Sequence, residues 1–150
     1  MTGSQIKVDR PETTQGDDNT AASVSNVATG SGLGDITLIA RGTGEDILLN
    51  MDITGVGAIT LEAADAVTTS VGIDLVATGA NSGVSVTATA GAISLSGNVS
   101  SGATTGTLTG GQISMVAGGA LTMTTGTSIT TLGTSGRASL QAGGYLILSQ

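Results

Sequence analysis

The chain lacks several residue types on which most compact domains depend. Among its 150 residues there is no Cys, His, Phe or Trp, Tyr145 is the sole aromatic residue and Pro11 is the sole proline. The absence of cysteine excludes disulfides, thiolate catalysis and thiolate metal sites. A core without Phe or Trp has to be built from Val, Ile, Leu, Met and Ala, so we expect it to be narrow and regular.

Charge is also scarce, and it is confined largely to the first half. The 11 acidic residues lie between Asp9 and Asp74, whereas beyond Leu75 the only charged side chain is Arg137. With four basic residues and a pI near 4.1, the chain has no phosphate-neutralising patch and no stacking platform, so no nucleic-acid partner is expected. An uncharged surface gives little protection against self-association, which indicates that the second half packs against something.

The sequence contains no apolar run of the roughly 18 residues that a membrane span requires, so we expect no membrane insertion. The first residues lack the apolar region of a signal peptide. Residues 1–32 are polar and rich in turn-forming residues, and we expect them to form an N-terminal arm or cap. The remaining residues, 33–150, are expected to form one repeat domain.

One pattern recurs through the repeat domain: a glycine or small residue, then strict alternation of apolar and polar residues. It is seen in "GDITLIARG", "GAITLEAAD", "GAISLSGNV" and "GGQISMVAGG". Such alternation over four to six residues is typical of half-buried strands. Copies recur at an irregular interval of roughly 20 to 25 residues, and the Asn-Gly and Asp-Gly turns of antiparallel hairpins are absent. The sequence therefore predicts an all-β parallel β-solenoid (β-helix) of about five coils rather than a sandwich.

The alternation assigns side chains to the two faces of each strand. The inward residues would stack on their equivalents about 4.8 Å away in the next coil. They are Ile36, Leu38, Ile59, Leu61, Ile73, Ile93, Leu95, Ile113, Met115, Leu121 and Met123. We expect Ile36, Ile59, Ile93 and Ile113 to head equivalent strands. The two Gly-Gly repeats between residues 110 and 123 would then mark successive faces of one coil, or the same face of two.

The open ends of such a solenoid are the candidate assembly surfaces. An end strand carries unpaired N–H and C=O groups, which charges, proline or a cap usually protect. The last strand, "GYLILSQ", has none of these, so either the sequence is a piece of a longer chain or this end stacks on a neighbour, with Tyr145, Leu146 and Leu148 as the candidate residues. Ile6 and Val8 at the other end could cap a coil or be donated to a neighbour. The expected partner is another copy of the chain, end to end or laterally; a host or neighbouring-cell surface is a further candidate.

The strands "GDITLIARG", "GGQISMVAGGALTMTTG" and "GRASLQAGGYLILS" resemble the degenerate repeats of filamentous-haemagglutinin-like and autotransporter-like bacterial surface proteins. This resemblance covers roughly residues 34–150. It implies a right-handed parallel β-helix and an extracellular, non-catalytic role as a stalk, adhesin or fibre component.

Three chemical alternatives to this role have some support in the sequence. A polysaccharide-processing enzyme would need clustered carboxylates or calcium, and the close acidic pairs Asp46–Asp52 and Glu62–Asp65 are more typical of solvated strand ends. A metal site at residues 16–19 lacks calcium-loop spacing, so no metal, cofactor or catalytic residue is assigned. Ice binding through Thr122, Thr124 and Thr130 would require the same Thr-x-Thr in successive coils, which other coils replace with serine or valine.

Overall fold

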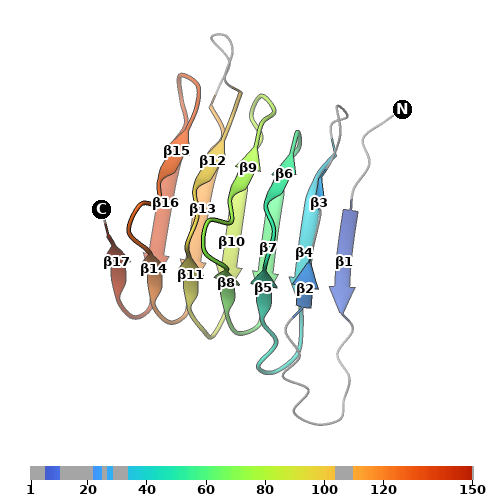
Figure 1. Ribbon diagram of the computed structural model, residues 1–150, viewed down its shortest axis with the longest axis vertical. Helices are drawn as coiled ribbons and strands as arrows, with labels where there is room; N and C mark the ends of the chain where they lie inside the picture. The colour runs from blue at the N-terminus through green and yellow to red at the C-terminus, as the bar shows by residue number, and fades with distance from the viewer. Residues whose placement is uncertain (1–5, 11–21, 25–26, 29–33, 104–109, 150) are drawn as a thin grey trace.

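The computed structural model describes residues 6–10, 22–24, 27–28, 34–103 and 110–149, with side chains for 34–103 and 110–149. Throughout these residues the regular structure is β-strand, and every strand pairing is parallel. The chain visits three sheets in turn and then returns to the first, one strand spacing further along (Figure 1). This confirms the expected all-β parallel solenoid, although the structure has about four turns with described side chains in every strand, β4 to β15, where about five coils were expected.

The three sheets differ in strand length. The base sheet has the longest strands: β1 (Ile6–Arg10), β4 (Ile36–Ala40), β7 (Ile59–Ala63), β10 (Val84–Ala88), β13 (Gln112–Ala117) and β16 (Arg137–Ala142). The second sheet contains β2 (Ala22–Val24), β5 (Ile47–Leu49), β8 (Val67–Thr69), β11 (Ile93–Leu95), β14 (Leu121–Met123) and β17 (Leu146–Leu148). The third sheet contains β3 (Val27–Ala28), β6 (Ile53–Gly55), β9 (Leu75–Ala77), β12 (Val99–Ser101) and β15 (Ile129–Thr131).

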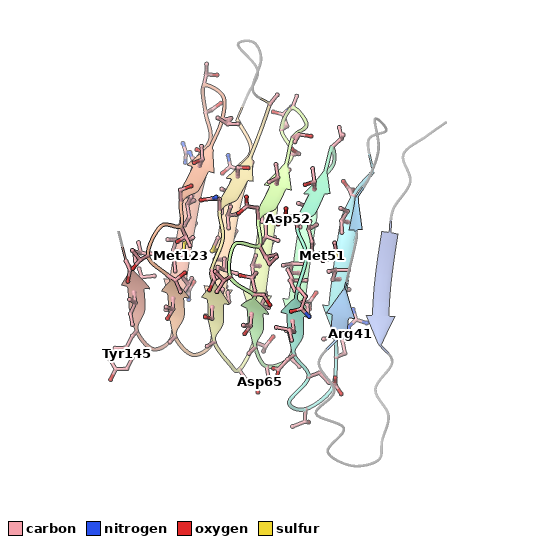
Figure 2. All side chains as sticks on the ribbon, in the orientation of Figure 1. Arg41, Met51, Asp52, Asp65, Met123 and Tyr145 are labelled. Carbon is pink, nitrogen blue, oxygen red and sulfur yellow. The ribbon has the colours of Figure 1, made fainter. Side chains whose placement is uncertain are left out.

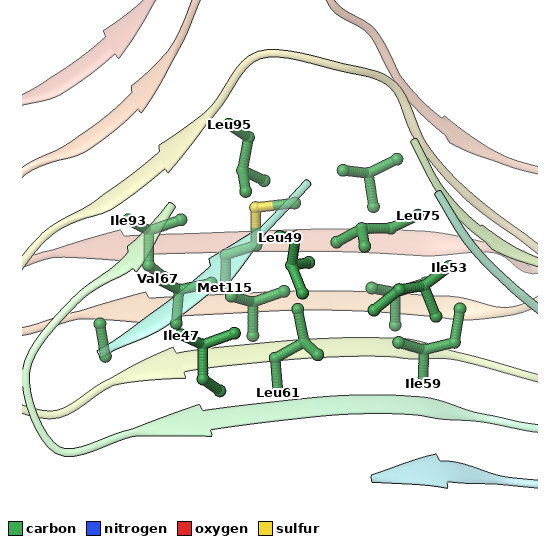
Figure 3. Packing of buried hydrophobic residues seen from close by; sticks show 14 of the residues in the cluster. Ile47, Leu49, Ile53, Ile59, Leu61, Val67, Leu75, Ile93, Leu95 and Met115 are labelled. Atoms are coloured by element: carbon green, nitrogen blue, oxygen red, sulfur yellow. The ribbon is translucent and has the colours of Figure 1, made fainter. Parts of the chain in front are cut away.

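The cross-section is therefore a triangle with one long side and two short sides. Figure 3 shows Ile59 and Leu61 on the base, Ile47 and Val67 on the second side, and Ile53 on the third, all converging on one interior. Alternation along each strand sends one apolar residue in and the next side chain out. Aliphatic side chains alone fill so narrow an interior, which accounts for a core without Phe or Trp.

The residues expected to point inward mostly lie in this core. The expectation that Ile93 heads a strand equivalent to those of Ile36, Ile59 and Ile113 was wrong. Ile36 and Ile59 share a column of the base sheet with Val84 and Ile113, whereas Ile93 belongs to the second sheet, in register with Val67 and Leu121. The misassignment arose because strands of two different sheets share the motif Gly-Ala-Ile-x-Leu. The expected inward residues that lie buried are Ile36, Leu38, Ile59, Leu61, Ile93, Leu95, Ile113, Met115, Leu121 and Met123.

Ile73 lies outside the strand in which it was expected. It belongs to the corner before β9, is half-buried, and packs against the core from there, while Leu75 and Ala77 are the buried residues of the strand itself. The alternation Ile73, Leu75, Ala77 continues through the corner, so the pattern alone did not mark where the strand begins.

The strands of the base sheet from β4 onward end at alanine, and glycine follows two of them, because the corner that comes next has little space for larger side chains. The last inward position of that sheet forms one column in register, where a small side chain lets the chain turn towards the second sheet. Its members with described side chains are Ala40, Ala63, Ala88, Ala117 and Ala142. Gly118 follows Ala117, and a Cβ there would overlap the carbonyl oxygen of Thr89 in the preceding turn.

The repeated Gly-Gly motif is explained by the corners of a single turn. Gly110 and Gly111 precede β13, and Gly118 and Gly119 connect β13 to β14. The two repeats are therefore successive faces of one coil, the first of the two alternatives.

Part of residues 1–32, expected to be an arm or cap, forms strands of the same sheets. β1, β2 and β3 pair with β4, β5 and β6 respectively. Ile6 pairs with Ile36 and Val8 with Leu38 at the backbone level. Residues 16–19, the candidate metal site of the sequence, lie outside the described residues.

Candidate functional site

The most distinctive surface is the end of the solenoid formed by β15, β16 and β17, which we call the open end. In the order of the sheets these are the terminal strands opposite β3, β1 and β2. Leu146 is 50% exposed and Leu148 is 52% exposed, whereas Leu121 and Met123, their register partners one turn earlier, are 0% and 3% exposed. The open end therefore presents to solvent the residues that other turns bury.

The exposed apolar surface continues beyond these two leucines. Ile147 is exposed on the outer face of β17, and Tyr145 projects away from the solenoid at the corner before that strand (Figure 2). Leu140, Ala142 and Ile129 are half-buried against the core. Exposed apolar patches of this kind mark interaction surfaces more often than isolated apolar residues do.

A pocket of about 250 Å³ lies between β17, the end of β14 and the corner before β15. It is lined by Met123, Thr127, Ser128, Ile129, Leu148 and Ser149. Its apolar lining residues are Met123, Ile129 and Leu148.

Backbone groups at the open end also point away from the stack. In the earlier turns, the N–H groups of Ile59, Ile93 and Val99 each donate to a carbonyl of the following turn, at 2.8–2.9 Å. Successive residues in a strand point their N–H and C=O groups to alternate sides. The equivalent residues of the last strands therefore direct both groups towards the open end: Ile129, Thr131, Ala138, Leu140, Ala142, Leu146 and Leu148.

The candidate assembly residues thus separate into two groups. Tyr145, Leu146 and Leu148 lie together at the open end, where the structure adds Ile147 and Ile129. Ile6 and Val8 lie at the opposite end, in β1. Sequence reasoning missed Ile147 because alternation assigned it to the outer face; the signal was the unbroken run Leu146, Ile147, Leu148.

The acidic residues of the repeat domain have a structural role that sequence reasoning did not find. Asp35, Asp46, Asp52 and Asp74 each occupy the position directly before a strand. The Oδ1 atom of each accepts a hydrogen bond from the backbone N–H of the equivalent residue one turn later, at 2.6–2.9 Å. These carboxylates satisfy backbone donors at the corners, where no ladder partner exists.

Asp52 and Asp74 begin a continuous chain of such bonds along the corner before the third sheet. Asp52 accepts from the N–H of Asp74, Asp74 accepts from Asn98, and the Oδ1 of Asn98 accepts from the N–H and hydroxyl of Ser128. We call this row the corner ladder. The signal in the sequence was an Asp, Asn or Ser directly before the first apolar residue of β6, β9, β12 and β15.

The second acidic pair of the sequence is divided between a strand and a corner. Glu62 lies on the outer face of β7, in register with Thr87, whereas Asp65 lies in the corner before β8. In the described part of the chain, no three acidic residues cluster in a way that could hold a metal ion.

The outer faces carry hydroxyls in one regular row. On the base sheet, Thr37, Thr60, Ser85, Ser114 and Ser139 follow one another in register. The neighbouring outward row is mixed, with Ile39, Glu62, Thr87, Val116 and Gln141.

The threonines considered for ice binding lie on the other two sheets. On the second sheet, Thr122 lies between Ser94 and Ile147. Thr124 follows β14, and Thr130 lies in β15 beside Ser100. Two parallel threonine rows, which ice binding would require, are not formed on these faces.

Comparison with known proteins does not assign the chain to a family. No protein-family model, curated protein or solved structure matches it. Within the described residues, the structure has no helix long and apolar enough to cross a bilayer.

Proposed function

We propose that this chain is a non-enzymatic structural or adhesive β-solenoid of a bacterial cell surface or extracellular fibre, and that it associates with copies of itself. The scarcity of charge on the outer faces carries this proposal: beyond Leu75 the only charged side chain is Arg137, so the surfaces of β10 to β17 lack the charges that usually keep protein surfaces apart.

The charge distribution supports self-association. At the open end, Arg137 is the only charged side chain of β15, β16 and β17. Natural proteins usually protect an exposed strand edge with charges, proline or a bulge. Apart from Arg137, β15, β16 and β17 carry no charge or proline of this kind.

The resemblance of the repeats to filamentous-haemagglutinin-like and autotransporter-like surface proteins supports the extracellular placement. A stalk or fibre needs length and stiffness rather than a reaction centre. A solenoid supplies both, since each turn adds one strand to each of three sheets. A host or neighbouring-cell surface is the second partner that this role implies.

Sedimentation velocity over a wide concentration range tests the self-association. We expect the wild-type chain to sediment as a larger species as its concentration rises. The double variant Leu146→Lys, Leu148→Lys should stay monomeric, because it places two charges on the open end while their half-exposed positions let the ammonium groups reach water.

Val71→Lys is the matched control, since Val71 is 91% exposed at a corner in the middle of the solenoid. This variant should sediment like the wild type. Thermal melting followed by circular dichroism verifies that all three proteins are folded. A wild-type chain that remains monomeric at the highest concentration would contradict the proposal.

A further inference from the structure

We infer that the outer face of the base sheet over β7, β10, β13 and β16 is a contact surface between two copies of the chain, whose stacks lie side by side and run antiparallel. This inference rests on the self-association proposed above and adds a lateral contact to it. The face lies along the side of the stack, so further strands at either end of the base sheet would extend it without covering it.

Short, uncharged side chains form the middle of this face. Ser85 and Thr87 on β10 lie in register with Ser114 and Val116 on β13, and all four point outward. Val116 is exposed there. Sheets with short outward side chains can pack about 10 Å apart with those side chains interdigitated. The middle of the face therefore allows close contact and holds no charge that opposes it.

Two charged side chains of opposite sign lie at the two ends of this face. Glu62 is exposed on the outer face of β7, and Arg137 is exposed on the outer face of β16. The two strands between them, β10 and β13, contribute no charged residue. The face is therefore acidic at one end and basic at the other.

These two charges select the antiparallel arrangement. If the two stacks ran parallel, Glu62 would lie over β7 of the other copy and Arg137 over its β16, so that like charges would meet. Antiparallel stacks that face each other about an axis between β10 and β13 instead place β7 of each copy over β16 of the other. Glu62 of each copy then lies at the same end of the contact as Arg137 of the other, where the opposite charges attract. Charge complementarity of this kind determines orientation more than affinity.

Antiparallel stacks also keep the acidic corners of the two copies apart. Seven acidic residues and one basic residue lie between positions 34 and 74, whereas Arg137 is the only charged residue beyond Leu75. Parallel stacks would bring the acidic turns of both copies side by side. Antiparallel stacks place the acidic turns of each copy beside the nearly uncharged turns of the other, which lowers the repulsion between them.

The size of the face limits the strength of the contact. Four strands at a spacing of about 4.8 Å, each of about five residues, cover roughly 19 Å by 17 Å. This flat area is less than half of the roughly 800 Å² that each partner buries in a standard complex. We therefore expect the contact to form between copies that the proposed association already holds close together, where the effective concentration is high.

Single spin labels measure the arrangement, and the absence of cysteine among the described residues lets each label be placed by one substitution. Ser114→Cys and Thr37→Cys lie in the same outward row, on β13 and β4. For antiparallel stacks, electron paramagnetic resonance of associated samples should show labels on two copies within about 15 Å at position 114 and about 25 Å apart at position 37.

Parallel stacks would give the same short distance at both positions, and stacking end to end would give the same long distance at both. Equal distances, or no coupling at either position, in a chain that still associates would overturn the antiparallel contact and leave the self-association standing. Monomeric sedimentation of the wild type, together with no coupling, would overturn both.

Exchanging the two charges provides a second test. Glu62→Arg and Arg137→Glu each bring like charges together, so each should lower the fraction of coupled labels at position 114 by about twofold or more. The double variant restores opposite charges and should recover the wild-type fraction. Val71→Lys, which adds a charge outside the face, is the control and should keep that fraction unchanged. A double variant that loses as much coupling as the single variants would contradict the pairing of Glu62 with Arg137.

Discussion

The Oδ1 atom of Asp74 accepts a hydrogen bond from the backbone N–H of Asn98, one turn further along the solenoid, at 2.6 Å. The bond lies in the middle of the corner ladder, where Asp74 also donates its own N–H to Asp52. A single aspartate thus connects three successive turns at a corner that the sheets do not cover.

Replacing Asp74 by Ala should lower the free energy of unfolding by about 1 kcal/mol, because the N–H of Asn98 loses its acceptor. Asp74→Asn is the matched control: it retains an acceptor oxygen, as Asn98 does in the next turn, and should cost less than half as much. Urea denaturation measures both. Equal losses in the two variants would show that the carboxylate acts through its charge and not as an acceptor.

Replacing Ile93 by Asp should unfold the chain at room temperature, because the side chain is fully buried and an unpaired carboxylate there costs more than about 4 kcal/mol. Ser94→Asp is the control, since Ser94 lies on the outer face of the same strand, and this variant should melt cooperatively like the wild type. Circular dichroism compares them. Cooperative melting of the Ile93→Asp protein at the wild-type temperature would mean that the assigned register of β11 is wrong.

Replacing Gly97 by Ala should destabilise the chain by about 2 kcal/mol or more, since a Cβ there would overlap the carbonyl oxygen of Ile73 in the preceding turn and force the backbones apart. Gly72→Ala offers a comparison at a corner with open space. Its φ of +77° should cost only about 1 kcal/mol. Chemical denaturation should therefore rank Gly97→Ala as the less stable variant; the reverse order would contradict the close approach of the two turns.

Two buried hydroxyls should respond differently to removal. The Oγ of Ser101 is buried and has no hydrogen-bond partner among the described residues, so Ser101→Ala should leave the stability unchanged or raise it by up to about 1 kcal/mol. The Oγ1 of Thr69 accepts from the N–H of Ser96 at 2.8 Å, so Thr69→Val should cost about 1 kcal/mol or more. Thermal unfolding monitors both. A large loss from Ser101→Ala would indicate a bond to that hydroxyl.

The alternation of apolar and polar residues was sufficient to predict the inward face of most strands, because successive side chains of a strand point to opposite faces. It could not tell which sheet a strand belongs to. Ile93 and Ile113 follow similar glycine-rich segments, yet one lies on the second sheet and the other on the base. That distinction depends on loop length, which is irregular here.

The site was less predictable than the fold for a related reason. The run Tyr145, Leu146, Ile147, Leu148 is visible in the sequence, but its exposure depends on which strands lie beside it. The corner ladder also required the structure, since Asp52 and Asp74 are adjacent only because one turn separates them in space. The residue pattern of one strand does not indicate which residues of the neighbouring turn lie beside it.

The alanine column of the base sheet has a mechanical consequence. Because small side chains from Ala40 to Ala117 lie in register, neighbouring turns pack at one corner with little side-chain interlocking. The bonds that join the turns run along the direction of stacking, so a tension applied in that direction loads them one turn after another. A chain pulled from its ends would therefore yield by peeling single turns at modest force, extending by one coil at each step, in place of a single abrupt rupture.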